Sequence, residues 1–331
     1  YEAGTSEAEG AAARVAAAML APLAESAVAP VSVVRMGHYA LSRWPELLAP
    51  LAQPVFFQRE GTLVLWHRQD PAEATRLAGV LARTGAQVPE LAPMQALDTP
   101  AAIAALEPSL GTRFARGLYL PGEGQHDNRA LLASLRATLE ADARVTLHWQ
   151  SPRAPSDFSP GTAGQPDWVI DCRGLGAKPQ WNALRGVRGE VIRVHAPEVT
   201  LQRPTRLVHP RYPLYIAPKP DHLFVIGATE IESDDLSPAS VRSTLELLSA
   251  AYAVHSGFAE ARIVEIATQC RPTLPDNLPA IRQPLPRVLQ INGLYRHGFM
   301  IAPALLDAAM ELLAHGRATL ARGFGMDVPD A

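Results

Sequence analysis

Two arginines and one tyrosine in this chain have the side chains and sequence positions to bind a small carboxylic acid. Tyr215 lies in a strand-like segment, Arg271 at the end of another, and Arg296 in a glycine turn. A guanidinium fork binds a carboxylate through two parallel hydrogen bonds, and a tyrosine hydroxyl can add a third. No sequence cluster of carboxylates or histidines accompanies them, so the pattern favours a carboxylate anchor over a hydrolase or metal site. Each arginine alone is also typical of a surface ion pair.

The segment around Arg296 predicts a strand, a glycine turn and a helix. Residues 287–292 are rich in β-forming side chains, Gly293 opens the turn, and a helical apolar pattern over 304–315 ends at Gly316. The amino end of a helix carries free N–H groups and a partial positive charge, so this turn favours an anion. A plain strand–helix connection with a solvated Arg296 is the simpler interpretation.

The remaining pattern predicts a mixed α/β chain with two kinds of sheet. A buried-strand pattern over 168–171 leads into a turn at Gly174, the place where open α/β sheets bind ligands. Between 189 and 229 the strands alternate, which indicates an antiparallel sheet and a second domain. Further predictions are a hairpin over 56–66, strands over 145–149 and 263–267, and helices over 31–51, 71–85, 101–106, 127–139 and 237–255.

Size and composition limit the function classes. The chain has 331 residues, enough for two domains with a large core. The formal net charge is −3 and no basic cluster is visible, so nucleic-acid binding is not expected. No apolar run reaches the roughly 20 residues that a membrane span needs. The two cysteines, Cys172 and Cys270, are far apart without metal-ligand spacing, and they predict a reduced, cytoplasmic protein that binds no metal.

The first residues raise the question of a dinucleotide site. The segment 1–4 reads as the end of a strand that carries Glu2, and such an acid accepts hydrogen bonds from the ribose of a bound dinucleotide. The glycine fingerprint that belongs roughly 20 residues before such an acid is absent from the sequence. Either the numbered chain lacks its first strand, glycine loop and helix, or Glu2 is a solvated terminal residue. The alanine-rich run 11–22 either forms a closely packed helix or lets the backbone approach a large flat ligand.

Taken in order, these segments resemble the D-amino-acid oxidase family of flavoproteins, and within it the glycine oxidases that serve thiamine biosynthesis. The resemblance is carried by 1–4, 16–22, 214–219, 225–229, 271–276 and 293–303, which together span essentially the whole chain. It implies an FAD-binding, Rossmann-like domain interleaved with an antiparallel substrate domain. Two departures are the absent glycine fingerprint and Ala18, which stands before Met19 where we expect a glycine.

The resemblance also implies roles for individual residues. Arg271 would clamp the substrate carboxylate, Tyr215 would donate to the same group, and Arg296 would lie beside it and the flavin edge. The residues implied to contact FAD are Glu2 at the adenosine ribose, Ala18 and Met19 near the isoalloxazine ring, Gly174 in a cofactor-facing turn, and the backbone of Gly298, Phe299, Met300 and Ile301 against the ring. Further candidate neighbours of the active site are His209, Glu230 and His297.

The resemblance finally implies domain limits and a reaction. We expect an FAD-binding domain over 1–52, 115–185 and 265–331, and a substrate domain over 53–114 and 186–264. The expected reaction is oxidative deamination of glycine, sarcosine or small D-amino acids to the 2-oxo acid, ammonia or an amine, and hydrogen peroxide, with molecular oxygen as acceptor. A dehydrogenase that reduces a quinone, and a truncated relic that holds no FAD, are the alternatives. The family also favours a homo-oligomer.

Overall fold

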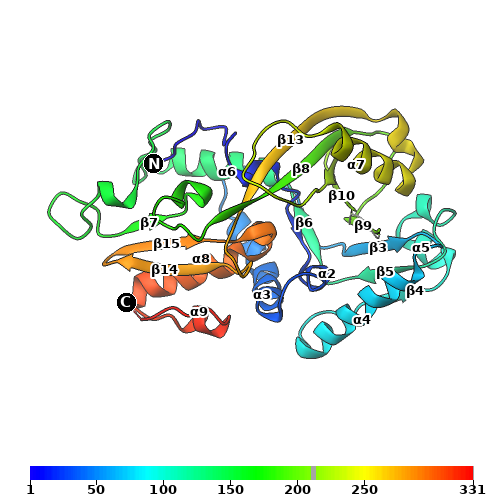
Figure 1. Ribbon diagram of the computed structural model, residues 1–331, viewed down its shortest axis with the longest axis horizontal. Coiled ribbons are helices and arrows are strands. Elements are labelled where there is room, and N and C mark those ends of the chain that lie inside the picture. The colour runs from blue at the N-terminus through cyan, green and yellow to red at the C-terminus, as the bar shows by residue number, and fades with distance from the viewer. Residues whose placement is uncertain (210–213, 331) are drawn as a thin grey trace.

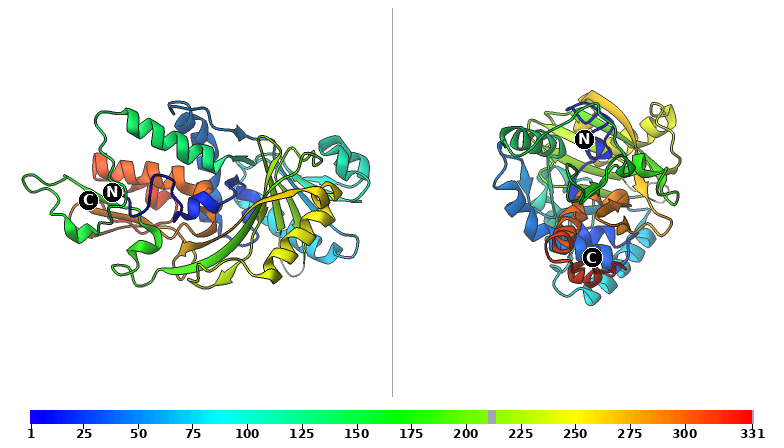
Figure 2. Two further views of the ribbon diagram at one scale, coloured as in Figure 1. Left: turned by 90° about the horizontal axis from the view of Figure 1, so that it is seen from above. Right: turned by 90° about the vertical axis from the view of Figure 1, so that its left-hand side faces the viewer.

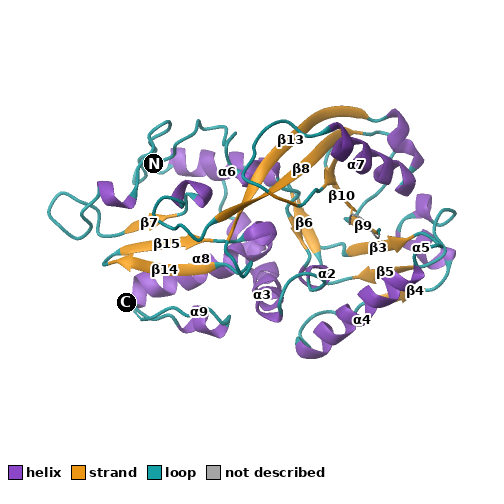
Figure 3. Cartoon of the chain, in the orientation of Figure 1, coloured by secondary structure: helices purple, strands orange, loops and turns teal. Residues whose placement is uncertain are grey.

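The computed structural model describes residues 1–209 and 214–330 as an elongated molecule (Figure 1). Within these residues, a three-stranded sheet with parallel pairing lies at one end and a nine-stranded sheet at the other; we refer to them as the small and the large sheet. Both termini lie at the end that holds the small sheet (Figure 2). Helices and strands are mixed along the chain (Figure 3), so the predicted mixed α/β class is confirmed.

The small sheet has the order β14-β15-β7. Its strands are β14 (Ala280–Leu285), β15 (Val288–Asn292) and β7 (Val169–Asp171). β15 is antiparallel to β14 and parallel to β7, so β7 and β15 end at the same edge, as the predicted ligand-binding edge requires. The chain leaves β15 through a 3₁₀ turn, η5 (Tyr295–His297), and enters α8 (Gly298–His315).

Helix α8 is a core helix that packs against α3 (Val31–Leu48). Met300, Ile301 and Leu305 are almost fully buried there. The segment Tyr295–His315 has the length and composition of a membrane span, but half of its apolar window is buried inside the protein. The helix ends at Gly316, whose φ of 64° lies in the left-handed region that the predicted glycine cap requires. The short helix α9 (Thr319–Gly323) follows.

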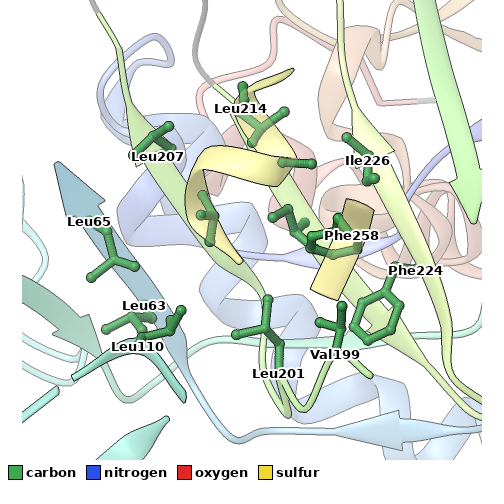
Figure 4. Close-up of a cluster of buried hydrophobic side chains, with 14 of the residues drawn as sticks. Leu63, Leu65, Leu110, Val199, Leu201, Leu207, Leu214, Phe224, Ile226 and Phe258 are labelled. Carbon is green, nitrogen blue, oxygen red and sulfur yellow. The ribbon is translucent and has the colours of Figure 1, made fainter. Parts of the chain in front are cut away.

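The large sheet has the order β12-β8-β11-β10-β9-β3-β5-β4, with β13 also paired to β8. Its strands are β3 (Thr62–Trp66), β4 (Gln95–Leu97), β5 (Gly117–Leu120), β8 (Arg185–His195), β9 (Thr205–Val208), β10 (Leu214–Lys219), β11 (Leu223–Gly227), β12 (Ile231–Glu232) and β13 (Arg262–Thr273). β10 and β11 form the predicted antiparallel pair. Its core, drawn in Figure 4, is closed by α7 (Val241–Val254) and includes Ile192, Leu207, Leu214, Phe224 and Phe258.

A third sheet, of order β1-β6-β2, connects the two ends. Its strands are β1 (Met19–Leu20), β2 (Phe57–Gln58) and β6 (Gly124–His126). The remaining α-helices of the described residues are α1 (Ala12–Val15), α2 (Pro22–Glu25), α4 (Pro71–Gln87), α5 (Pro100–Leu106) and α6 (Asn128–Ala141). The alanine-rich run therefore forms only one helical turn before it becomes extended, and this leaves its second half available to a ligand.

Several sequence predictions are wrong in detail. The predicted hairpin over 56–66 does not form, because β2 pairs with β6 and β3 pairs with β5 and β9. Segments 1–4 and 145–149 are not strands, although the N–H of Glu2 donates to the carbonyl of His148. Helix α7 begins at Val241 rather than at 237, because the Ser240 hydroxyl accepts the N–H of Ser243 and caps it.

The strand predicted over 263–267 is longer than expected. β13 continues to Thr273 and pairs with β8 along its length, so Arg271 lies inside a strand and faces a fixed partner. The large sheet also includes β5 and β13, which lie mostly within the limits expected for the FAD-binding domain. Strands from both expected domains therefore pair within the large sheet. The domain limits remain a prediction.

Candidate functional site

A cavity of about 2120 Å³ is lined by segments from both ends of the molecule. It collects the predicted site residues Arg271, Tyr215, Arg296, Glu2, Ala18, Met19, Gly174, Gly298, Phe299 and Met300, and also His209, Glu230 and His297. Ile301 does not line the cavity, since its side chain is fully buried in the core beside α3. Within the described part of the chain no three His, Cys, Asp or Glu side chains are grouped to hold a metal ion.

Arg271 is a half-buried cation that has no carboxylate partner among the described residues. Its guanidinium donates only to backbone carbonyls, at 3.3 Å to Thr229 and at 3.4 to 3.5 Å to Arg188 and Val187. No acid lies within salt-bridge distance of it among residues 1–209 and 214–330. Burial lowers the pKa of Arg271 from its ordinary value. A partly desolvated guanidinium without an acid is unfavourable, so an anion entering the cavity would be attracted to it.

Glycines make the space for Arg271 and for Tyr215. A Cβ on Gly189 of β8 would lie 2.5 Å from Nη2 of Arg271, and a Cβ on Gly227 of β11 would lie 2.6 Å from the hydroxyl of Tyr215. Tyr215 pairs in register with Gly227. Burial raises the pKa of Tyr215, so its hydroxyl keeps the proton it needs to donate. The large sheet therefore presents a cation and a hydroxyl donor at one place.

Arg296 is bound by acids on two sides, unlike Arg271. Its Nε lies 3.0 Å from Oε2 of Glu25, and its Nη1 donates to Oε2 of Glu230 at 2.7 Å. Glu25, at the end of α2, also accepts from Nη2 of Arg206 at 2.7 Å. Burial alone would raise the pKa of Glu25, but Arg296 and Arg206 outweigh it and hold that pKa far below its usual range. Arg296 lines the cavity with its charge already matched, and its position beside the substrate and the flavin stays a prediction.

His297 and Tyr295 complete this helix side of the cavity. Nδ1 of His297 lies 3.4 Å from Oε2 of Glu25, and burial lowers the pKa of His297 to about 4, so the imidazole is neutral at pH 7. The hydroxyl of Tyr295 donates to Oε1 of Glu230. Burial and that hydrogen bond raise the pKa of Tyr295 to about 12. Neither side chain is therefore suited to act as a base at neutral pH.

Buried polar groups hold the alanine-rich loop against the cavity. Nζ of Lys219 donates to the carbonyl of Ala17 at 2.9 Å, to that of His126 at 2.7 Å and to Oε1 of Gln125 at 3.0 Å. Nδ2 of Asn128 donates to the carbonyl of Ala13 at 2.7 Å. Lys219 is one of only two lysines in the chain. Its three N–H bonds match three oxygens, an arrangement that the planar fork of an arginine could not copy.

Ala18 occupies a backbone conformation that favours glycine. Its φ of 53° lies in the left-handed region, which costs an alanine roughly 1 kcal/mol. The expectation of a glycine before Met19 thus has a physical basis in this turn. The turn at Gly174, with φ 57°, is of the same kind, and its carbonyl accepts Nδ2 of Asn292 at 2.9 Å, which links the ends of β7 and β15.

The cavity fits FAD by its size and by the residues at its two ends. Its volume exceeds the roughly 300–1,000 Å³ of common small-ligand sites. A Cβ on Gly298 would meet nothing within 4 Å, so the start of α8 lies open to a ligand. Phe299 closes this region with its ring 4.8 Å from that of His126, and its carbonyl accepts Nε1 of Trp44. Oε1 of Glu2, at the far end, accepts the N–H of Gly4 at 2.8 Å. Ala18, Met19, Gly174 and the start of α8 would hold the group.

These features define the site as a dinucleotide-sized cavity joined to a carboxylate pocket, and the comparisons agree. Residues 1–311 match the DAO family of FAD-dependent oxidoreductases. A protein of Rhizobium etli, provisionally named thiamine biosynthesis oxidoreductase ThiO, is 42% identical over 303 residues, which cover 90% of this chain and 84% of the relative. The chain therefore belongs to the DAO family, and FAD is its cofactor. The family predicted from the sequence is confirmed.

Solved structures show the same fold. Glycine oxidase from Geobacillus kaustophilus has a TM-score of 0.78 and 22% identity, with 96% of this chain and 88% of that chain covered. Iminodiacetate oxidase from Chelativorans sp. BNC1 has a TM-score of 0.78 and 22% identity, with 98% and 91% covered. The predicted class of enzyme, an amino-acid-oxidase-like flavoprotein, agrees with this family and fold.

Sequence reasoning missed Glu25, Arg206 and Lys219. Glu25 ends an alanine-rich run and Arg206 lies in β9, a strand that was not predicted, so neither stands out locally. Lys219 was included only in the segment 214–219 that carries the family resemblance, although its rarity among 30 basic residues was a usable signal. What connects Glu25 to Arg206 and Arg296 is the fold alone.

Proposed function

We propose that this protein uses FAD to oxidise small amino acids at the bond between Cα and nitrogen, with glycine, sarcosine and small D-amino acids as substrates and oxygen as acceptor. The observation that carries the proposal is Arg271, a half-buried guanidinium that lines the cavity with backbone carbonyls as its partners. The substrate carboxylate would supply the missing anion, and the hydroxyl of Tyr215 would donate a further hydrogen bond.

The protein's part in this reaction is orientation. Arg271 and Tyr215 would fix the carboxylate, so that the adjacent Cα–H has one direction relative to the start of α8. FAD, when bound, would supply the ring that accepts the hydride from the substrate Cα. No side-chain base is required if the amine binds in its neutral form, and the lowered pKa of His297 and the raised pKa of Tyr295 agree with that. The imine released would hydrolyse to the 2-oxo acid and ammonia.

The relatives support a metabolic setting. The Rhizobium relative carries a thiamine-biosynthesis name, and we propose that this enzyme likewise supplies an oxidised glycine unit to thiazole synthesis. We further propose a cytoplasmic location, which suits the two free cysteines, and a homo-oligomeric state. Light scattering on the purified protein would measure the number of subunits.

A visible spectrum followed by anaerobic mixing tests the proposal. The purified protein should carry, or take up from added FAD, a yellow flavin, and glycine or sarcosine should bleach it. Air should then restore the colour and yield hydrogen peroxide. A protein that takes up no flavin would overturn the proposal. Bleaching without reoxidation by air, but with reoxidation by a quinone, would favour a dehydrogenase.

A further inference from the structure

Glu230 lies at the mouth of the carboxylate pocket and is held from two sides. It follows Thr229, whose carbonyl accepts both terminal nitrogens of Arg271 at 3.3 Å. Its own carboxylate accepts the hydroxyl of Tyr295 and Nη1 of Arg296. The side chain is 46% exposed, and it lines the cavity. The carboxylate is therefore fixed in position and still open to an incoming molecule.

The charges around Glu230 leave room for one anion. The ion-paired group that includes Glu230 has two cations, Arg206 and Arg296, and two acids, Glu25 and Glu230, and Arg271 is the further cation bound to the carbonyl before Glu230. His297 adds no charge at pH 7. One positive charge remains, and Arg271 is the arginine without an acid. A substrate with a single carboxylate balances this pocket, whereas a second carboxylate would face Glu230 with no cation left for it.

We propose that Glu230 determines the substrate class: it admits amino acids with one carboxylate and excludes those that carry a second carboxylate on or near the amine. The inference rests on the proposed function. Because the nitrogen of an α-amino acid is one carbon away from its carboxylate, a substrate held by Arg271 keeps its amine in the space bordered by Glu230, Tyr295 and Arg296. An amine there is attracted by the Glu230 carboxylate, and an anionic substituent is repelled by it.

Three compounds that share the glycine unit and differ only in the substituent on the nitrogen isolate the effect of charge near Glu230. Glycine has a bare amine, sarcosine adds a methyl group to the nitrogen, and iminodiacetate adds a carboxymethyl group. The enzyme should oxidise glycine and sarcosine with similar kcat/KM, and should bind iminodiacetate at least 10-fold more weakly than sarcosine. Binding of iminodiacetate is followed by the change in flavin absorbance, and the apparent affinity for glycine and sarcosine by the dependence of the anaerobic bleaching rate on their concentration.

The variant Glu230→Gln tests the charge while keeping the size and an acceptor for Tyr295. We expect its KM for glycine to rise by 3- to 10-fold and its affinity for iminodiacetate to increase by 10-fold or more. The matched control is Glu232→Gln, on the same segment, whose exposed carboxylate pairs with Arg185 away from the cavity. The control should leave all three probes unchanged.

A specificity role predicts that Glu230→Gln binds glycine more weakly and iminodiacetate more tightly, whereas a structural role predicts that both are bound more weakly. If Glu230→Gln weakens the binding of both compounds, Glu230 only holds Arg296 and Tyr295 in place, and the inference is wrong. If Glu232→Gln shifts the probes equally, the effect is one of net charge, and the inference is also wrong. Wild-type protein that binds flavin but none of the probes would instead contradict the proposed function.

Discussion

The two sides of the cavity handle their charges in opposite ways. On the large sheet, Arg271 lies over Gly189, and within residues 1–209 and 214–330 its hydrogen-bond partners are backbone carbonyls and no acid lies within salt-bridge distance. On the helix side, Glu25 gathers Arg206 and Arg296 into a buried ion network. The ion pairs of the helix side need no ligand to balance their charges. The positive charge of Arg271 on the large sheet is balanced only when an anion binds. The cation that lacks a partner is therefore the better guide to the substrate site.

Replacing Arg271 should have the largest effect on activity. Arg271→Met removes a charge-assisted, bidentate contact, and we expect KM for glycine to rise by about 100-fold, which is near 3 kcal/mol. Arg271→Lys keeps the positive charge but loses the bidentate fork, so its KM for glycine should lie between the values of the wild type and Arg271→Met. FAD affinity, measured by titration, should stay within a factor of about 3. An equal loss of flavin and substrate binding would show that Arg271 is structural.

Replacing Glu25 should mainly lower stability. Glu25→Gln leaves the partly buried Arg206 without its acid and Arg296 with Glu230 alone, and breaking a buried ion network costs about 3 kcal/mol. Urea unfolding measures this loss. Glu46→Gln, which removes an exposed partner of Arg43, is the control and should change stability by less than about 1 kcal/mol. If both variants unfold at the same urea concentration, the network does not hold the helix side together.

Glu123, which contacts the helix that carries Glu25, should make the stability of the protein depend on pH. It accepts the N–H of Ala24 at 2.7 Å, and burial raises its pKa to about 7. In the unfolded chain it titrates near 4.5, so its contribution to stability is fully present below pH 4.5 and is lost as the pH rises through 7. Glu123→Gln should thus gain about 1 to 3 kcal/mol over the wild type at pH 8 and nothing at pH 4. Parallel pH profiles of the two proteins would contradict the assignment.

The smallest effect is expected at Ala18. Its left-handed backbone favours glycine, so Ala18→Gly should stabilise the protein by up to about 1 kcal/mol, once the greater flexibility of unfolded glycine is subtracted. Thermal unfolding of the flavin-free protein is the measurement. Ala17→Gly has no such strain to release and should be neutral or destabilising. A loss of stability in Ala18→Gly would mean that the alanine methyl contributes more packing than the turn costs.

Local signals predicted the parts of the fold that local physics controls. Asp127 was predicted to cap a helix, and its carboxylate accepts the N–H groups of Arg129 and Ala130 at the start of α6. Gly316 ends α8 as expected, and β10 and β11 pair around the turn at Asp221. Each of these features depends on residues within a few positions of one another, so a sequence pattern can report it.

Long-range pairing defeated the same reasoning. The halves of the predicted hairpin over 56–66 each look like a strand, but β6 and β9 offer better partners elsewhere in the chain. Within the site, the sequence offers Arg271 at a predicted strand end and Arg296 in a glycine turn as equally plausible carboxylate ligands. Only the fold brings Glu25 to Arg296 and Gly189 to Arg271. As a result, the charge of Arg296 is matched by an acid and that of Arg271 is not.

The distribution of lysine has a practical consequence for handling this protein. Of its two lysines, Lys219 is buried with all three N–H bonds in use, and Lys178 has a side chain that is 43% exposed and paired with Asp234. Amine-reactive dyes and coupling resins thus find a single accessible lysine side chain, close to the segment that carries Asp234. Attachment through the Lys178 side chain alone would fix the protein to a surface in one orientation.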